Sequence, residues 1–211
     1  GDLEGFSDEG FLATRNWTSG YFPEGAQRLT GTTMYDTILK ERDTCFACAV
    51  RCKRVVEVPN MVDPLYGGPE YETVAALGVG CGIVDTEAVL KGSQLCNDLG
   101  MDTISAGGVV QWAMECYEKG IITDKDTGGM PVLWGDGSVL VNLLEMIAHR
   151  KLIGDVLAEG VAKAARVVGG DSWKWAMHVK GLEYSRAEIR ARTGYALALA
   201  VNPRGADHLH S

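Results

Sequence analysis

The sequence predicts a mainly α fold with little strand. At least six segments carry apolar side chains at the three- and four-residue spacing of a helix, and several of them end at a glycine. Residues 53–58 are the one run with the character of a short strand. The chain has 211 residues, of which 46% are hydrophobic, so it is long enough for one large domain, or one and a half small ones, around a proper core.

Composition narrows the function classes. The net charge of -8 argues against a nucleic acid or an anionic membrane as partner. No apolar run reaches the length of a membrane span, and no charged-then-apolar leader opens the chain. The six cysteines include a closely spaced trio, which indicates a reducing, cytoplasmic setting rather than a disulfide scaffold.

The next expectations concern the segments before and after the three closely spaced cysteines. We expect residues 1–23 to be irregular and residues 24–42 to form a helix with a weak apolar period. Another helix is expected to start at Pro69, after Gly67 and Gly68, and to run towards residue 80. Glu70 and Glu72 suit the first turn of such a helix, where the dipole favours negative charge. The paired glycines also let a ligand approach the backbone, which favours a functional role for Glu70.

Two helices are expected over 85–100 and 102–120, joined by a polar turn at 97–102. A junction of this kind offers side chains and free N–H groups to an anion or a hydrogen-bonding heterocycle, although it is equally an ordinary connection. Further helices are expected over 138–150, 152–168 and 186–201.

Two histidines in the second half of the chain each lie near a carboxylate in the sequence. Glu145 and His149 are four residues apart, a spacing that suits a metal but is commoner in a surface pair. After the last helix, His208 follows Asp207 in a polar stretch, and a histidine beside a carboxylate suits proton transfer. The alternative for that stretch is a frayed polar terminus.

The cysteines at 45, 48 and 52 form a C-x2-C-x3-C run, which brings three thiols together within eight residues. Thiolates are soft ligands for zinc or for iron–sulfur clusters. Zinc sites usually use two separated knuckles, and no second knuckle is present, so the run favours a [4Fe–4S] cluster over zinc. Buried free thiols are the remaining alternative for the trio. That role is expected for the three isolated cysteines, Cys81, Cys96 and Cys116. The fourth cluster ligand is expected beyond residue 211, and one of these three cysteines is the alternative.

Six motifs together resemble the tungsten-containing aldehyde:ferredoxin oxidoreductase family. They occur in the family's order, and the similarity runs from about Trp17 to Ser211. The motifs are the cysteine run, GGPEYET at 67–73, LCNDLGMDTIS at 95–105, MECYEKG at 114–120, VKGLE at 179–183 and NPRGADHL at 202–209.

Members of this family are much longer. They begin with a β-rich domain that cradles a tungsten bound by two pterin dithiolenes, and two mostly helical domains follow. The resemblance implies a helical middle domain with the cluster loop at 1–178 and the start of the C-terminal helical domain at 179–211. The chain also lacks an initial methionine, so we expect a fragment that is inactive in isolation.

The resemblance also implies roles for individual residues. The cluster would take three ligands from this chain, Cys45, Cys48 and Cys52. Glu70 would be the active-site carboxylate near the metal, and His208 the active-site histidine. The pterin would contact Asn97, Gly100, Met101 and Asp102. The usual family pattern there is Asp-x-x-Gly-Leu-Asp, so the first and fifth positions depart from it. A region that often reads Asp-Pro-Arg is Glu188-Ile189-Arg190 here, which indicates a different lining on the substrate side.

The activity implied is oxidation of an aldehyde to a carboxylic acid at a tungsten or molybdenum bis-pterin, with electrons passing through the cluster to ferredoxin. A homo-oligomer is expected for the full-length protein. Three alternatives stay open: a reductase subunit of the same superfamily acting on an acyl-CoA or aromatic substrate, an electron-transfer module, and a structural zinc domain.

Overall fold

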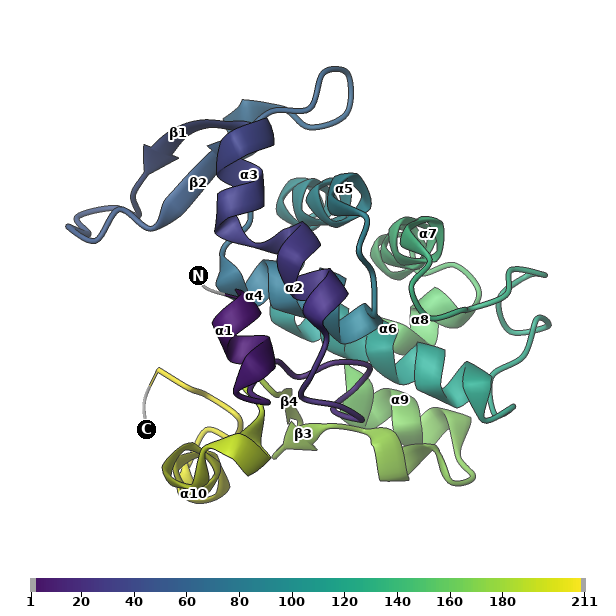
Figure 1. Ribbon diagram of the computed structural model, residues 1–211. Helices are drawn as coiled ribbons and strands as arrows, with labels where there is room; N and C mark the ends of the chain where they lie inside the picture. Colours follow the sequence, from purple (N-terminus) through teal and green to yellow (C-terminus); the bar gives the residue numbers. More distant parts are fainter. Residues whose placement is uncertain (1–2, 210–211) are drawn as a thin grey trace.

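A computed structural model describes residues 3–209 and confirms the mainly α fold (Figure 1). Helices pack around a central helix, α6, and the strands form two small two-stranded sheets. The helices are α1 (Leu3–Asp8), α2 (Pro23–Leu29), α3 (Gly31–Thr37), α4 (Tyr71–Thr73), α5 (Thr86–Asp98), α6 (Thr103–Glu118), α7 (Gly137–Ala148), α8 (Ile153–Leu157), α9 (Val161–Val168) and α10 (Thr193–Val201).

The N-terminal part differs from the expectation in two ways. Residues 3–8 are helical rather than irregular, because Leu3 is buried in the main core and anchors α1 there. The expected single helix over 24–42 is also wrong. Thr30 has an extended backbone that separates α2 from α3, and the chain then continues as β1 (Leu39–Asp43). Strand pairing thus overrides the weak helical period.

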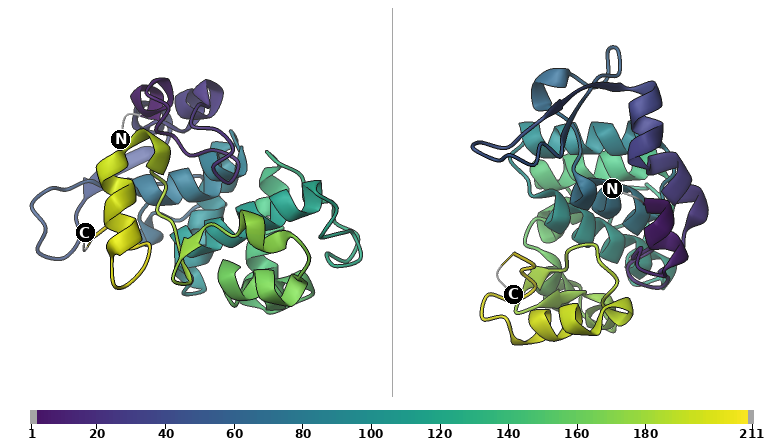
Figure 2. Two further views of the ribbon diagram at one scale, coloured as in Figure 1. Left: turned by 90° about the horizontal axis from the view of Figure 1, so that it is seen from below. Right: turned by 60° about the vertical axis from the view of Figure 1, so that its left-hand side comes forward.

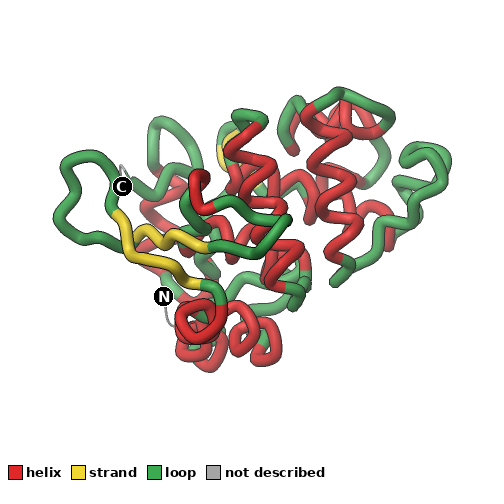
Figure 3. Tube along the Cα trace, turned by 90° about the horizontal axis from the view of Figure 1, so that it is seen from above, coloured by secondary structure: helices red, strands yellow, loops and turns green. Residues whose placement is uncertain are grey.

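The predicted strand after the cysteines is confirmed as β2 (Lys53–Val56), which pairs antiparallel with β1. The two strands make a hairpin whose long connecting loop carries Cys45, Cys48 and Cys52. The hairpin extends away from the helices, with the loop at its outer end (Figures 1 and 3). Its base has a small core of its own, in which Val56, Val62 and Leu90 are buried.

The segment from 64 to 81 is helical but irregular. The α-helix begins at Tyr71 rather than at Pro69, and Glu70 takes the extended conformation just before it. A π-helical turn (Val74–Gly78) and a 3-10 turn (Val79–Cys81) follow, all of them buried. Close packing explains the glycine at 80, since a Cβ there would lie 2.2 Å from Nε2 of Gln111 on α6.

The two helices predicted over 85–120 are confirmed as α5 and α6. Asp85 caps α5 by accepting hydrogen bonds from the backbone N–H groups of Glu87 and Ala88, at 3.0 and 3.2 Å. Helix α6 is buried from Ala106 to Cys116 and forms the centre of the main core. The three isolated cysteines are buried, as expected, and burial raises the pKa of each thiol to about 12; they are Cys81, Cys96 and Cys116.

The helices of the C-terminal part are shorter than expected. Gly160 has φ of +83° and divides the predicted helix over 152–168 into α8 and α9. The small sheet of β3 (His178–Val179) and β4 (Leu182–Glu183) follows, and residues 186–192 lead into α10 without forming its first turns. This segment returns to the N-terminal helices, where Arg192 forms an ion pair with Glu9 at 3.0 Å (Figure 2). Within residues 3–209 no helix combines the length and apolar character needed to cross a membrane.

Candidate active site

The cysteine loop presents its thiols outwards. Cys45 and Cys52 are exposed and Cys48 is half-buried, in contrast to the core cysteines. The backbone N–H of Cys48 donates to the carbonyl of Cys45 at 3.0 Å, which closes a tight turn over the C-x2-C part of the motif. Ala47 and Arg51 both adopt positive φ values, 58° and 53°, so the loop turns sharply twice within the motif.

The donor set of this loop fits an iron–sulfur cluster better than any other group of side chains in the described chain. Its three thiols are accessible, and thiolate is the ligand that such clusters use. Among residues 3–209, no three His, Cys, Asp or Glu side chains are already gathered in the geometry of a metal site. The loop therefore offers the ligand chemistry of such a cluster, and its sulfur atoms would have to converge to bind one.

A pocket of about 360 Å³ lies beside the loop and joins three of the motifs. The hairpin contributes Cys45, the start of α4 contributes Glu70, and the α5–α6 turn contributes Asn97, Met101 and Asp102. Sγ of Cys45 lies 3.9 Å from Oε1 of Glu70. The structure thus brings together five residues that sequence reasoning had selected from separate stretches.

The α5–α6 turn is shaped by its local sequence. Gly100 takes a positive φ of 69° after the end of α5, and a Cβ there would meet nothing within 4 Å. Asp102 caps α6 by accepting from the N–H of Ser105 at 2.7 Å. The pocket beside this turn also has hydroxyl groups from Ser93, Thr73 and Thr103. Such a rim of hydroxyl, amide and carboxylate groups fits a heterocycle that both donates and accepts hydrogen bonds.

His208 lies on the other side of Asp102. It lines a neighbouring pocket of about 420 Å³, to which Asp102 and Asp207 also contribute. Asp207 is buried and accepts a hydrogen bond from Arg204 at 2.6 Å, which holds the polar stretch against the body of the protein instead of leaving it frayed. Glu70 and His208 therefore occupy adjacent pockets on either side of Asp102 rather than one shared pocket.

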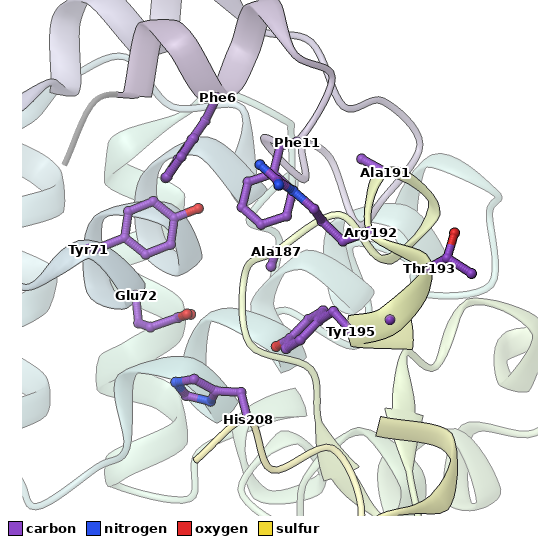
Figure 4. Close-up of a pocket in the computed structure, with 11 residues that line it drawn as sticks. Phe6, Phe11, Tyr71, Glu72, Ala187, Ala191, Arg192, Thr193, Tyr195 and His208 are labelled. Atoms are coloured by element: carbon purple, nitrogen blue, oxygen red, sulfur yellow. The ribbon is translucent and has the colours of Figure 1, made fainter. Parts of the chain in front are cut away.

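A third pocket, of about 860 Å³, also contains His208 (Figure 4). Glu72 and Tyr195 reach the same end of it, and neither was selected from the sequence as a site residue. For Glu72 the first-turn position gave no reason to prefer a site over helix stabilisation. The structure gives it a long-range contact, because its Oε2 accepts from the backbone N–H of Arg186 at 2.7 Å.

Arg186 itself was missed as well. Its side chain is fully buried and donates to Oε1 of Gln111 and to the carbonyl of Ile104, both at 3.0 Å. The guanidinium lies 4.4 Å from the ring centroid of Trp17, a cation–π contact. Burial lowers the pKa of Arg186 to about 10, and the nearby carboxylate of Glu72 opposes that shift. The residue stays charged at neutral pH and ties the first turn of α6 to the chain leading to His208.

The Glu188-Ile189-Arg190 segment and the Glu145–His149 pair do not join the pockets around Asp102. Glu188 is buried and accepts from Arg190 at 2.8 Å, so the Glu-Ile-Arg variant forms a local ion pair. It lies in a separate pocket of about 250 Å³. Nε2 of His149 lies 3.3 Å from Oε2 of Glu145, with both side chains about half exposed. No further ligand joins them in the described chain, so they form a surface pair.

Comparisons with known proteins agree with these observations. The family described as "Aldehyde ferredoxin oxidoreductase, domains 2 & 3" matches residues 3–211. The chain is 38% identical over 204 residues to a tungsten-containing aldehyde ferredoxin oxidoreductase of Thermococcus kodakarensis, covering 96% of this chain and 33% of the relative. It is also 32% identical to a protein of Pyrococcus furiosus named aliphatic sulfonate oxidoreductase, WOR-like subunit, over 82% of this chain and 29% of the relative.

A solved structure has the same fold. It is the active-site complex BamBC of benzoyl coenzyme A reductase with 1,5-dienoyl-CoA, which matches with a TM-score of 0.70 and 24% identity. The match covers 87% of this chain and 28% of that chain. The chain spans about a third of the length of the curated relatives it matches. It belongs to the aldehyde ferredoxin oxidoreductase family of oxidoreductases, within the part described as domains 2 and 3.

Proposed function

We propose that this chain is the part of a tungsten-dependent enzyme that holds an iron–sulfur cluster, contacts the pterin and supplies acid–base groups for the oxidation of aldehydes to carboxylic acids. The observation that carries the proposal is the 360 Å³ pocket in which Cys45, Glu70 and Asp102 meet from three motifs. An electron-transfer module would need the thiols without the carboxylate, and a structural zinc domain would need neither the carboxylate nor the turn.

The reaction converts an aldehyde and one water into a carboxylic acid, two protons and two electrons. When bound, a tungsten bis-pterin centre accepts the electron pair, and a [4Fe–4S] cluster passes the electrons singly to ferredoxin. In this chain, Cys45, Cys48 and Cys52 would hold the cluster. The α5–α6 turn would hold the pterin through Asn97, Gly100, Met101 and Asp102. We propose no fourth cluster ligand within this chain.

Glu70 and His208 are the proton-transfer groups in this proposal. Glu70 is exposed to the pocket and lies beside Cys45, where a carboxylate can take a proton from water as it adds to the carbonyl carbon. His208 approaches from the neighbouring pocket and can donate a hydrogen bond to the aldehyde oxygen or take up the second proton. These roles require the substrate to lie between the two pockets, next to Asp102.

Aldehyde oxidation is favoured over the reductive alternative by the relatives. The proteins named as aldehyde oxidoreductases are 36% to 38% identical to this chain. The benzoyl coenzyme A reductase structure is 24% identical and supports the shared fold alone. A reductive activity towards acyl-CoA or aromatic substrates is the competing outcome of the experiment below.

The test combines metal analysis with turnover in the anaerobically purified holoenzyme. We expect tungsten or molybdenum together with about four irons per cluster, and reduction of ferredoxin on addition of an aldehyde. Glu70→Gln should lower kcat by on the order of a hundredfold with unchanged metal content, as expected for a proton-transfer group. Glu87→Gln, which alters a first-turn acid of α5 that does not line the pocket of Glu70 and Cys45, is the control. Zinc alone, or an unchanged rate for Glu70→Gln, would contradict the proposal.

A further inference from the structure

The 860 Å³ pocket has an aromatic wall. Phe6 from α1, Phe11 from the following loop and Tyr71 from α4 lie on one side, and Tyr195 from α10 lies opposite (Figure 4). The rings of Phe6 and Phe11 are edge-to-face, with centroids 5.1 Å apart and an interplanar angle of 74°. Those of Phe6 and Tyr71 are 5.6 Å apart at 89°. The three rings support one another, so this wall is formed before any ligand arrives.

Three polar side chains of the pocket gather at its other end, whereas Arg192 lies beside Phe11. Glu72, Tyr195 and His208 face the side away from Phe6 (Figure 4). Each of the first two is held by a hydrogen bond: Oε2 of Glu72 accepts from the backbone of Arg186 at 2.7 Å, and the Tyr195 hydroxyl bonds that of Ser185. Burial raises the pKa of the Tyr195 phenol, which therefore stays protonated at neutral pH. The pocket thus has an apolar body and a hydrogen-bonding end.

The polar end leads towards the proposed reaction centre. His208 is shared with the 420 Å³ pocket, and Asp102 is shared between that pocket and the one containing Glu70. The three pockets therefore lie next to one another in a row, from the cysteine loop to the aromatic wall, and each shares one lining residue with the next. A molecule whose body fills the aromatic pocket would direct its end past His208 towards Asp102.

We propose that the aromatic pocket selects the substrate, and that the substrate is an uncharged aromatic aldehyde whose ring lies against Phe6, Phe11 and Tyr71. That the substrate carries an aldehyde group rests on the proposed function. That it carries an aromatic ring is inferred from this pocket. A planar apolar ring can make offset or edge-to-face contacts with the rings of this wall, whereas a short aliphatic aldehyde offers no ring for such contacts. The cation nearest this wall is already engaged, because Arg192 lies 4.8 Å from the Phe11 ring centroid and pairs with Glu9.

The first experiment compares benzaldehyde with acetaldehyde as substrates of the holoenzyme. The parent should prefer benzaldehyde in kcat/KM. Phe11→Ala should lower kcat/KM for benzaldehyde by about tenfold or more, mostly through KM, and change that for acetaldehyde by less than about twofold, because only the larger substrate contacts the ring. Phe11→Leu should recover part of the loss. Tyr35→Ala removes an aromatic side chain that is 70% exposed elsewhere and should alter neither substrate.

The second experiment measures binding without turnover. Benzamide, an unreactive ring of similar size, should bind the parent holoenzyme in a ligand-observed NMR titration and bind Phe11→Ala about tenfold more weakly, while Tyr35→Ala binds like the parent. If no aldehyde is turned over but benzamide still depends on Phe11, the proposed reaction fails and the aromatic site stands. If acetaldehyde is turned over but neither benzaldehyde kinetics nor benzamide binding depends on Phe11, the pocket is not the substrate site. Failure of benzamide to bind the parent holoenzyme would also overturn the site, as expected if another part of the enzyme fills the pocket.

Discussion

Replacing Arg186 with methionine should destabilise the protein by about 2–4 kcal/mol, because the side chain makes two buried, charge-assisted hydrogen bonds and one cation–π contact. Each hydrogen bond contributes about 1.5–3 kcal/mol, and a desolvated cation–π contact about 2 kcal/mol. Part of this is recovered, because methionine removes a buried charge and the Nε atom of Arg186, which has no hydrogen-bond partner among the described residues.

Urea unfolding is the appropriate measurement. With a slope of about 2 kcal/mol per molar, the loss corresponds to a fall of about 1–2 M in the midpoint. Arg166→Met, which changes an exposed arginine in the last turn of α9, should shift the midpoint by no more than about 0.3 M. A midpoint for Arg186→Met as close to the parent as that of the control would refute the reasoning. It would mean that removing the buried charge offsets the whole of the lost bonding.

Further predictions concern the cysteines and two glycines. In the metal-free protein at pH 8, a thiol reagent should label the three loop cysteines rapidly and the three buried ones only after denaturation. Burial raises the pKa of the three buried thiols to about 12, so above about pH 9 the native state keeps protons that the unfolded state loses. The free energy of unfolding should therefore fall as the pH rises from 9 towards 12. A flat alkaline unfolding profile would contradict this. In the holoenzyme, Cys48→Ala should abolish the visible absorbance of the cluster, and retained absorbance with full iron content would remove this residue from the ligand set. Gly107→Ala should lower the free energy of unfolding by about 1–3 kcal/mol, because its Cβ would lie 2.7 Å from the carbonyl oxygen of Ala76. Gly194→Ala has open space and should be neutral or stabilising when both variants are compared by urea unfolding.

Local patterns made the central helices and the hairpin's second strand predictable. Capping aspartates at 85 and 102 and the apolar spacing between them define α5 and α6 without help from tertiary structure. The first strand could not be found in this way, because residues 39–43 are mostly charged and form a strand only by pairing with residues 53–56. The π-helical turn depends in the same way on packing against α6, which a local pattern does not encode.

The residues of the candidate site likewise differ in whether the sequence predicts them. Motif order selected Cys45, Glu70 and Asp102, and these residues lie together. It did not select Arg186. The importance of this residue comes from its hydrogen bonds to Gln111 and Ile104, which lie 75 and 82 positions earlier in the chain. The aromatic wall is assembled from three elements that are separated in the sequence, so no single stretch of sequence predicts it. The roles proposed for the site residues, and the division of the chain near residue 178, stay predictions.

The hairpin that carries the thiols has a consequence for how the proposed cluster would be assembled. Its apolar base is a small cluster separate from the main core, and two-stranded hairpins contribute little stability of their own. Opening the hairpin therefore costs much less than unfolding the helices, and its backbone amides should exchange with solvent sooner than those of α6. The thiols can then rearrange around iron and sulfide while the rest of the fold stays intact, so cluster assembly would act on an already folded recipient.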